Sequence, residues 1–510
     1  MRYSNNSVNA TVGLMFLTLV SKILGFVREM VISYMYGASA MSDAYSLANS
    51  VTVLIITGIA AGIMTAYIPS AMELEGQRER DAFTSNLINV ISVVSGVIAV
   101  LCIIFAEPIV SFLGMGFTET TKGYTIILFR FVMLAAVSIF IIYIMSGYLN
   151  TKQNFSYSGI QLILTNLIII IAVLCSEYNP MQLGIGYYIA YLIPFVLGFG
   201  LCKKYKFEYS FHLSFRDARV KNIFILSLIA FVGTNVVKFD VMVDRIFASS
   251  LQEGTVAAIN YAFTLTSIFP EVFIMSIITV GYPKLAEWFA NNNQNQISTY
   301  VNNMLVNTCV ILLPITVLFL EMGTWIVQIL FQRGAFNESD TLLTVGILNS
   351  YTYGMLGMGI SMVLCKVFFA WKKEWVPAVC LAIGIVVNVV FNVLFSRSGV
   401  NAIAITTSIS VSICAIMMLI MLIIMFKEIK IYSLFKSCIK ILFAILISKN
   451  IISFGMGLCD SYQSEGAIIK LLILMAIATI ALMVYVLLLY MLNIEGVRTY
   501  WLDLRKKIKK

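Results

Sequence analysis

Three charged residues inside an apolar stretch are the first sign of chemistry in this chain. The segment Ser21–Asn49 reads SKILGFVREMVISYMYGASAMSDAYSLAN, and a helix that begins near Val12 carries Lys22, Arg28 and Glu29 in its body. A charged side chain at the centre of a bilayer costs about 3 kcal/mol on insertion scales, so such residues usually face a partner or a watery cavity. The pattern indicates the lobe of a transport protein rather than a passive anchor.

A tight turn follows this charged helix. Gly37 is expected to end it, and Asp43 stands at the head of the next helix. A carboxylate at such a position can cap free backbone N–H groups. Asp43 is therefore a candidate site residue together with the three charges before it.

The composition places these residues in a membrane. The chain has 510 residues, of which 60% are hydrophobic and only 12% charged, and apolar runs of about 20 residues recur along its length. Each run can cross a hydrocarbon core of about 30 Å. We therefore predict an all-α polytopic membrane protein with about fourteen spans. They run roughly over 11–36, 43–72, 84–112, 121–149, 156–176, 181–203, 221–250, 256–288, 298–331, 340–371, 375–396, 401–426, 434–456 and 467–493.

Basic residues between the spans predict the orientation. Lys and Arg gather in the loops after even-numbered spans and at both ends of the chain, whereas the loops after odd-numbered spans hold only Lys122, Arg333 and Arg397. Because Lys and Arg prefer the cytoplasmic side, both termini are predicted to be cytoplasmic. This bias and the attraction of anionic lipid account for the net charge of +9, which gives no reason to expect nucleic acid. The first apolar run lacks a small-residue cleavage site and is expected to stay in the protein.

The nine cysteines form no CxxC pair and no metal-ligand spacing, and they lie mostly in apolar spans. We interpret them as small apolar residues in helix packing.

The opening stretch has a second copy later in the chain. One constant shift along the sequence aligns both Arg28 with Arg245 and Gly37 with Gly254. Both copies start on odd-numbered spans, so they form a parallel repeat about an axis along the membrane normal. We predict two six-helix lobes, 1–206 and 207–426. Residues 427–510 then hold two extra helices, which are expected to pack outside one lobe, and a basic cytoplasmic tail.

Four segments resemble a known family. They are SKILGFVREMVISYMYGASAMSDAYS (21–46), DRIFASSLQEGTVAAINYA (244–262), LFQRGAFNESD (330–340) and FFAWKKEWVPAVCLAIGIVVNVVFNVLF (368–395). In order and spacing they are similar to the MurJ/MviN lipid II flippases of the multidrug/oligosaccharidyl-lipid/polysaccharide exporter superfamily.

The resemblance implies a flippase of the bacterial cytoplasmic membrane, which moves a polyprenyl-diphosphate-linked peptidoglycan precursor from the inner to the outer leaflet. Lys22 and Arg28 match the family's basic pair, with Glu29 beside them and Asp43 as the acid beyond. Arg suits this role because it binds phosphate oxygens bidentately and stays protonated. The sequence itself adds Lys238, Arg245 and Lys366 as further cations, although Arg245 near a helix end can instead reach the membrane surface. Membrane lipids are the other expected partners, and the chain is expected to act as a monomer.

Two departures from the family concern the substrate. Basic residues that grip the diphosphate in other members are missing here, where the positions fall near Ile55 or Ile56 and on Thr264. The cavity must then hold its anion differently, or the cargo is another polyprenyl-linked glycan.

The resemblance also implies a sodium site in some members. The matching positions here are Asp244, Asn388 and Asn392, with Thr406 or Thr407 nearby. Amide, hydroxyl and carboxylate oxygens suit a hard monovalent cation. The alternative, which we favour because Asn392 stands where an Asp is usual, is that the asparagines hydrogen-bond between helices. No other cofactor is expected.

Two rival classes fit less well. A cation-coupled drug exporter of the same superfamily would share the twelve-helix core but would be expected to have an acidic or aromatic cavity. A polytopic glycosyltransferase needs acidic clusters in a sizeable soluble loop, and no loop here is long enough. We therefore expect a transporter of a lipid-linked glycan and not an enzyme.

Overall fold

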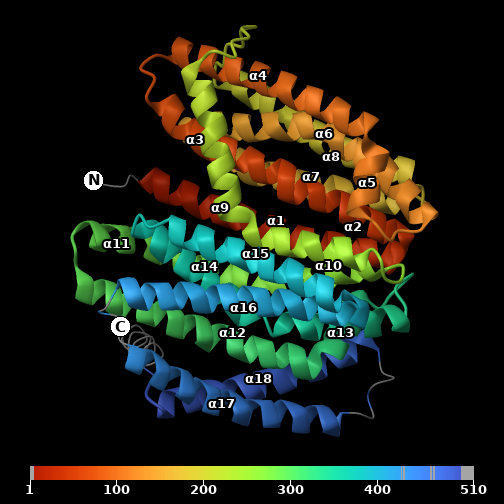
Figure 1. Ribbon diagram of the computed structural model, residues 1–510, viewed down its shortest axis with the longest axis vertical. Helices are drawn as coiled ribbons and strands as arrows, with labels where there is room; N and C mark the ends of the chain where they lie inside the picture. Colours follow the sequence, from red (N-terminus) through yellow and green to blue (C-terminus); the bar gives the residue numbers. More distant parts are fainter. Residues whose placement is uncertain (1–4, 427, 429–430, 460–461, 463–465, 495–510) are drawn as a thin grey trace. The chain divides into compact units, whose positions relative to one another are not determined.

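The computed structural model describes residues 5–426, 428, 431–459, 462 and 466–494, and all regular structure in these residues is helical. This confirms the all-α class. In chain order the helices labelled in Figure 1 and the short π- and 3₁₀-helices (η) between them are α1 (Asn5–Tyr36), α2 (Ala40–Val51), η1 (Thr52–Ile56), α3 (Thr57–Met72), α4 (Gln77–Ile104), α5 (Ala106–Leu113), α6 (Glu119–Thr151), α7 (Ser156–Cys175), α8 (Pro180–Lys204), α9 (Ala218–Ala248), α10 (Thr255–Phe269), η2 (Pro270–Ile274), α11 (Met275–Ala290), α12 (Gln294–Phe331), α13 (Glu338–Thr352), α14 (Met355–Ala370), α15 (Trp375–Phe395), η3 (Ser396–Ser398), α16 (Val400–Met425), α17 (Ile431–Leu458) and α18 (Ala467–Met491). The predicted basic tail lies outside the described residues.

The helices match the predicted membrane spans closely. Among the described residues, eleven helical segments are long and apolar enough to cross a membrane, and the bent pair α13–α14, which turns by 44°, adds a twelfth. These segments correspond to twelve of the fourteen predicted spans. The helices α1 and α9 stand at the places of the first and the seventh.

The repeat is visible in the order of the elements. Helix α4 begins at Gln77 and α12 at Gln294, which is the same shift along the sequence that relates Arg28 to Arg245. The starts of α7 and α15 follow nearly the same shift. The turns that follow α1 and α9 both contain a glycine in the left-handed region, with φ of 62° at Gly37 and 89° at Gly254. The two copies therefore share their turn geometry as well as their helices.

Each copy also interrupts its second span with one turn of π-helix. Residues 52–56 form η1, which continues into α3, and residues 270–274 form η2, which continues into α11. The spacing of the two interruptions along the chain agrees closely with the repeat shift. Single π-turns inside α-helices are rare and often mark functional sites, so their repetition is a further feature that the two copies share.

The described residues fall into two compact units. The first comprises residues 1–257 with 333–337, coloured red to yellow-green in Figure 1 apart from the short second segment, and the other comprises 258–332 with 338–510. Helix α9 belongs to the first unit, where it packs against α3. The predicted lobe boundaries at 206 and 426 stay predictions.

The chain between α8 and α9 is fastened along α4 by polar side chains spaced along that helix. Asn86 exchanges hydrogen bonds with the backbone of Ser214, donating at 3.2 Å and accepting at 2.7 Å. Asn89 donates to the carbonyl of His212 at 2.8 Å, and the backbone N–H of Glu208 donates to Asp81 at 3.2 Å. This pairing leads the chain directly from α8 into α9 within one unit.

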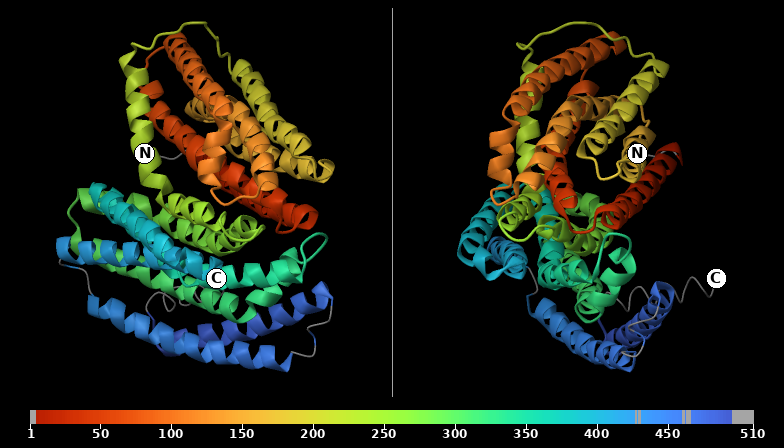
Figure 2. Two further views of the ribbon diagram at one scale, coloured as in Figure 1. Left: turned by 45° about the vertical axis from the view of Figure 1, so that its right-hand side comes forward. Right: turned by 90° about the vertical axis from the view of Figure 1, so that its right-hand side faces the viewer.

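In the second unit, α17 and α18 form a pair that packs along α12 (Figure 2). Tyr485 of α18 donates to the carbonyl of Val310 at 3.1 Å, and Lys470 donates to Gln328 at 2.9 Å. Lys449 of α17 lies 3.6 Å from Glu321 of α12. These polar contacts fasten the pair to the second unit at several points along α12.

Candidate functional site

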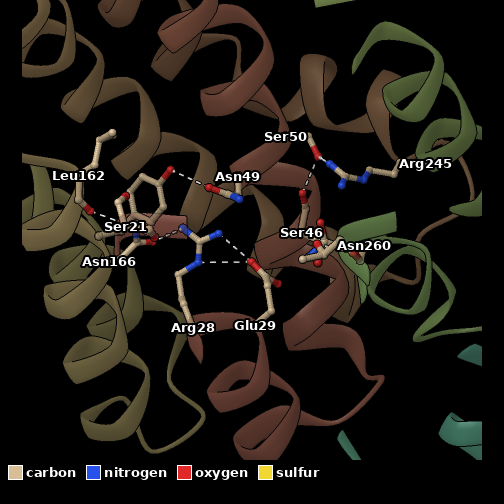
Figure 3. Close-up of polar contacts among 12 residues, drawn as sticks. Ser21, Arg28, Glu29, Ser46, Asn49, Ser50, Leu162, Asn166, Arg245 and Asn260 are labelled. Carbon is tan, nitrogen blue, oxygen red and sulfur yellow. Dashed lines mark hydrogen bonds and ion pairs between the residues drawn. The ribbon is translucent and has the colours of Figure 1, made fainter. Parts of the chain in front are cut away.

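Helix α1 presents the central ion pair of the first unit. Arg28 donates to Glu29 Oε1 from Nη2 at 2.7 Å and from Nε at 3.3 Å (Figure 3). The side chain of Arg28 is 18% exposed and that of Glu29 is 4% exposed, so both charges are largely removed from the surroundings. A pair as shielded as this resists separation, because either partner left alone would be a buried charge.

Asn166 of α7 holds the other side of the guanidinium. Arg28 Nη1 donates to Asn166 Oδ1 at 3.1 Å, and Asn166 Nδ2 donates to the backbone carbonyls of Ser21 at 3.3 Å and Leu162 at 2.9 Å. An arginine has five N–H groups, and three of them take part in the bonds to Glu29 and Asn166. The guanidinium is therefore fixed in direction and still has N–H groups to offer a phosphate oxygen.

Hydroxyl and amide groups of α2 and η1 contact Tyr187 of α8. Tyr187 of α8 donates to Thr52 Oγ1 at 2.8 Å and to Asn49 Oδ1 at 3.2 Å. Its ring lies edge-on to that of Tyr45, with centroids 6.3 Å apart. Figure 3 shows Asn49 near Arg28, so this part of the unit is polar within an apolar bundle.

Arg245, the repeat counterpart of Arg28, contacts the second helix of the first copy. It is 8% exposed, and its Nη1 donates to Ser50 Oγ (Figure 3). This burial contradicts the reading in which Arg245 extends to the membrane surface. Both members of the predicted arginine pair thus lie within the first unit and contact polar side chains there.

Asp43 caps a helix of the other copy. Its Oδ2 accepts from the backbone N–H of Gly254 at 2.7 Å and its Oδ1 from that of Ala257 at 2.7 Å, at the start of α10. Glu253 returns the contact, because its Oε1 accepts from the backbone N–H of Ala40 at 2.9 Å, at the start of α2. We call these reciprocal contacts the turn latch. In each case a carboxylate meets a helix N-terminus, where free N–H groups and the helix dipole favour negative charge.

Close backbone contacts surround the turn latch. A Cβ on Gly254 would lie 2.3 Å from the carbonyl oxygen of Ala38, and one on Gly334 would lie 2.3 Å from that of Tyr34. The loop that contains Gly334 also donates from the N–H of Ala335 to the carbonyl of Tyr34 at 2.8 Å. Three turns far apart in the sequence therefore meet at the end of α1, and only glycine fits two of the contacts.

The remaining predicted cations are more dispersed. Lys22 is half-buried on α1, six residues or about 9 Å along the helix from Arg28. Lys238 is exposed on α9. Lys366 lies on α14 in the second unit, with its Nζ 5.4 Å from the centre of the Phe369 ring.

The structure also shows where the positions lie at which the family's basic residues are missing from this chain. Ile55 and Ile56 lie in η1, where Ile56 is buried and Ile55 is 39% exposed. Thr264 lies on α10, and its hydroxyl donates to the carbonyl of Asn260 at 2.8 Å. Neither place offers a cation in this chain.

The predicted sodium ligands divide between the units. Asp244 is fully buried in the first unit, whereas the others lie on α15 and α16 of the second. There Asn392 donates to Asn388 at 3.1 Å, Asn388 donates to Thr407 at 2.7 Å, and Thr406 donates to Asn392 at 2.7 Å. The amides and hydroxyls thus form a chain of hydrogen bonds that joins the two helices.

Sequence reasoning missed two partners of the site. Asn166 lies 138 residues from Arg28 in a largely apolar span, where a buried amide is itself a signal of an interhelical contact. Glu253 stands directly before Gly254, the glycine of the second copy that matches Gly37. An acid next to the repeated glycine was the available signal for a second cap.

Comparisons with known proteins agree with this architecture. The family model described as "Lipid II flippase MurJ" matches residues 32–491. The lipid II flippase MurJ of Thermosipho africanus is 25% identical over 372 residues, which cover 72% of this chain and 75% of that protein. A probable lipid II flippase MurJ of Treponema pallidum is 25% identical over 403 residues, which cover 76% of each chain.

Solved structures give the same fold. A lipid II flippase MurJ in an inward closed conformation superposes with a TM-score of 0.77 at 24% identity, over 92% of this chain and 97% of that one. An inward-facing multidrug transporter of the MATE family reaches 0.67 at 15% identity, over 82% and 99%. The second likeness shows the fold alone. The match of the family model over most of the chain is specific, and the chain belongs to the lipid II flippase MurJ family.

Proposed function

We propose that this multi-pass membrane protein moves lipid II, the lipid-linked precursor of peptidoglycan, from the inner to the outer leaflet of the bacterial cytoplasmic membrane. The observation that carries the proposal is a fixed, largely buried Arg28 in a chain that the lipid II flippase family model matches over residues 32–491. A diphosphate with a sugar head group cannot cross hydrocarbon unaided, and a desolvated guanidinium is a strong partner for phosphate oxygens.

Arg28 receives the diphosphate in this proposal, and Lys22 and Arg245 add positive charge within the same unit. Glu29 keeps the guanidinium oriented and neutralises it while no substrate is bound. A phosphate oxygen then approaches the N–H groups that Glu29 and Asn166 leave available. Lys238 and Lys366 are candidates for contacts at other stages of transport. No step forms or breaks a covalent bond, so no catalytic residue is needed.

The turn latch closes one end of the transport path. With both termini in the cytoplasm, the end of α1 at Tyr36 faces outward, and Asp43 and Glu253 hold its turn against the start of α10. Lipid II enters from the inner leaflet while these contacts are made and leaves outward after they separate. The protein acts as a monomer in this proposal.

Asn388, Asn392 and Thr407 serve helix packing rather than sodium binding. Their support is the chain of hydrogen bonds between α15 and α16, together with the amide of Asn392 at a position where a carboxylate is usual. Transport by the reconstituted protein should therefore continue at an unchanged rate when potassium or choline replaces sodium. A rate that falls with sodium removal and recovers on its return would establish a coupling ion and contradict this assignment.

The transport function is tested by replacing a cell's own flippase. The chain is expressed in a strain depleted of its lipid II flippase, and lipid II on the outer leaflet is measured together with the abundance of the protein in the membrane. Growth and lipid II exposure should both recover. An abundant protein that restores neither, or that exports only another polyprenyl-linked glycan, would overturn the proposal.

A further inference from the structure

The first unit contains an apolar pocket that lies apart from Arg28 and the turn latch. It has a volume of about 420 Å³ and lies among α3, α4, α5, α6 and α9. Its buried wall includes Ala99 of α4 and both Met133 and Ala136 of α6. The two alanines leave the space that larger side chains would otherwise fill.

The described lining residues offer little to water or an ion. None of them carries a charged side chain, and two of their few polar groups, the hydroxyls of Ser95 and Ser227, donate to carbonyls of their own helices at 2.6 Å and 2.8 Å. A buried water needs two to four polar partners, and apolar cavities without them stay dry. The pocket is therefore suited to hydrocarbon.

The rim of the pocket continues into the apolar surface of the membrane spans. Ile55, Ile98 and Leu228 line it and are 39%, 54% and 52% exposed, and beyond Ile98 the surface of α4 continues with Val97 and Leu101, which are 56% and 49% exposed. On a membrane span such a surface meets lipid chains. A pocket that begins there is open to the hydrocarbon phase that surrounds the protein.

We propose that this pocket binds an acyl chain of a membrane phospholipid. Its volume is nearly three times that of an apolar cavity of about 150 Å³ that admits benzene, so it has room for a chain segment of several carbons. The tail of the transported lipid fits less well, because none of the described residues that line the pocket is a cation that could hold a diphosphate at its mouth. The bound chain fills the space beside a close contact between α3 and α9, where a Cβ on Gly62 would lie 2.5 Å from the carbonyl oxygen of Ser227.

The experiment uses the full chain in nanodiscs that contain a phosphatidylethanolamine with a photoreactive diazirine in its acyl chain. After irradiation, labelled residues are mapped by mass spectrometry. In the unaltered protein, label should appear on the pocket-facing residues of α4 and α6, including Ala99 and Ala136. Ala99→Phe fills the pocket and should remove this labelling, whereas Val97→Phe, on the exposed surface of the same helix, should leave it intact.

Three results would overturn the proposal. The first is label confined to the exposed surface of α4 in the unaltered, folded protein, a measurement that needs no variant. The second is pocket labelling that persists in a folded Ala99→Phe or, if that variant does not fold, in Ala136→Leu. The third is loss of pocket labelling when a polyprenyl diphosphate is added, which would assign the pocket to the tail of the transported lipid instead.

Discussion

Arg28 is oriented before any ligand arrives, because Glu29 and Asn166 bond to different edges of its guanidinium. A binding group that is already immobilised loses less conformational entropy when its ligand binds. The same arrangement links substrate binding to the stability of the fold, because Glu29, the counterion of Arg28, is almost fully buried and would lose this ion pair without it. Substitutions at this position must therefore be designed to separate the two effects.

We expect Arg28→Ala to lower both transport and the amount of folded protein. Removing one partner of a buried ion pair typically costs about 3–5 kcal/mol, because the remaining charge is left uncompensated. The double variant Arg28→Ala/Glu29→Gln removes both charges and should recover abundance without transport. Lipid II on the outer leaflet and protein in the membrane are measured for both. Normal transport by the abundant double variant would show that Arg28 does not bind the substrate.

At the residue scale the sequence was sufficient to predict the charged residues of the site but not the residues that contact them. Arg28, Glu29 and Asp43 stand out because charge is rare in apolar spans. Asn166 and Glu253 do not, since a single amide or acid has many possible neighbours until the helices are packed. The role of Asp43 also changed in its detail: it caps α10, in the second copy of the repeat, rather than its own helix.

At the scale of the elements, the turn latch should set how easily the end of α1 opens. A helix cap contributes about 0.5–2 kcal/mol, which changes an equilibrium roughly two- to thirtyfold. Asp43→Ala should therefore increase opening by a factor in this range, and Asp43→Asn, which keeps one acceptor oxygen, should have a smaller effect. The measurement is the rate at which a cysteine introduced at Ser39 reacts with a membrane-impermeant maleimide.

Glu119→Ala is the matched control for the latch. Glu119 is also an acid in the first turn of a helix, α6, but it is exposed. Its replacement should leave the reactivity at position 39 unchanged. Equal reactivity in Asp43→Ala and in the unaltered protein would contradict the role of the latch in closure.

Helices α17 and α18 should matter most for substrates with a long tail. They pack along α12 outside the repeated elements and expose large apolar side chains such as Phe443 and Leu472. A variant that ends after residue 426 should transport a shortened lipid II analogue better than the natural long-chain lipid, in proteoliposomes with matched amounts of protein. Equal loss for the two lipids would assign the pair a role in folding alone.

The elements themselves were largely predictable, and their irregularities were not. Long apolar runs bounded by polar residues give the spans, and Gly37 and Gly254 mark the turns. The π-turns at 52–56 and 270–274 are harder to predict. TVLII is an ordinary apolar helical sequence, whereas PEVFI begins with Pro270, which marks an irregular turn without specifying its type. The extra width of each turn depends on packing against neighbouring helices. The break between α13 and α14, which divides one predicted span, was likewise not predicted from the sequence.

At the scale of the whole molecule, the predicted orientation can be tested in cells. In a background without its native cysteines, a cysteine at Arg397 should react with an impermeant maleimide in intact cells. One at His212, in the segment fastened along α4, should react only after the membrane is permeabilised. Both cysteines would lie in segments that connect two consecutive helices, so the two labelling sites are comparable. The reverse pattern would place the termini outside and invert the proposed direction of transport.

The associations of the segments around α9 are not evident from the sequence. The lobe boundary at residue 206 stays a prediction, while Asn86 and Asn89 fasten the segment after α8 to α4, and α9 lies in the first compact unit. Residues 333–337 join the same unit through the bond from Ala335 to Tyr34. Hydropathy and charge identify the spans, whereas these associations depend on hydrogen bonds between segments distant in the chain.

The reciprocal form of the turn latch has a consequence for how it opens. Its contacts join the same two turns, so once Asp43 has met the start of α10, Glu253 and Ala40 are held at a high effective concentration with respect to each other. When one contact breaks and the other persists, the two turns gain little conformational freedom. The two should therefore form and break together, and thermal motion should yield a closed or an open turn pair with few states in between. The two caps, each weak alone, should therefore behave as one cooperative contact that is either fully formed or fully broken.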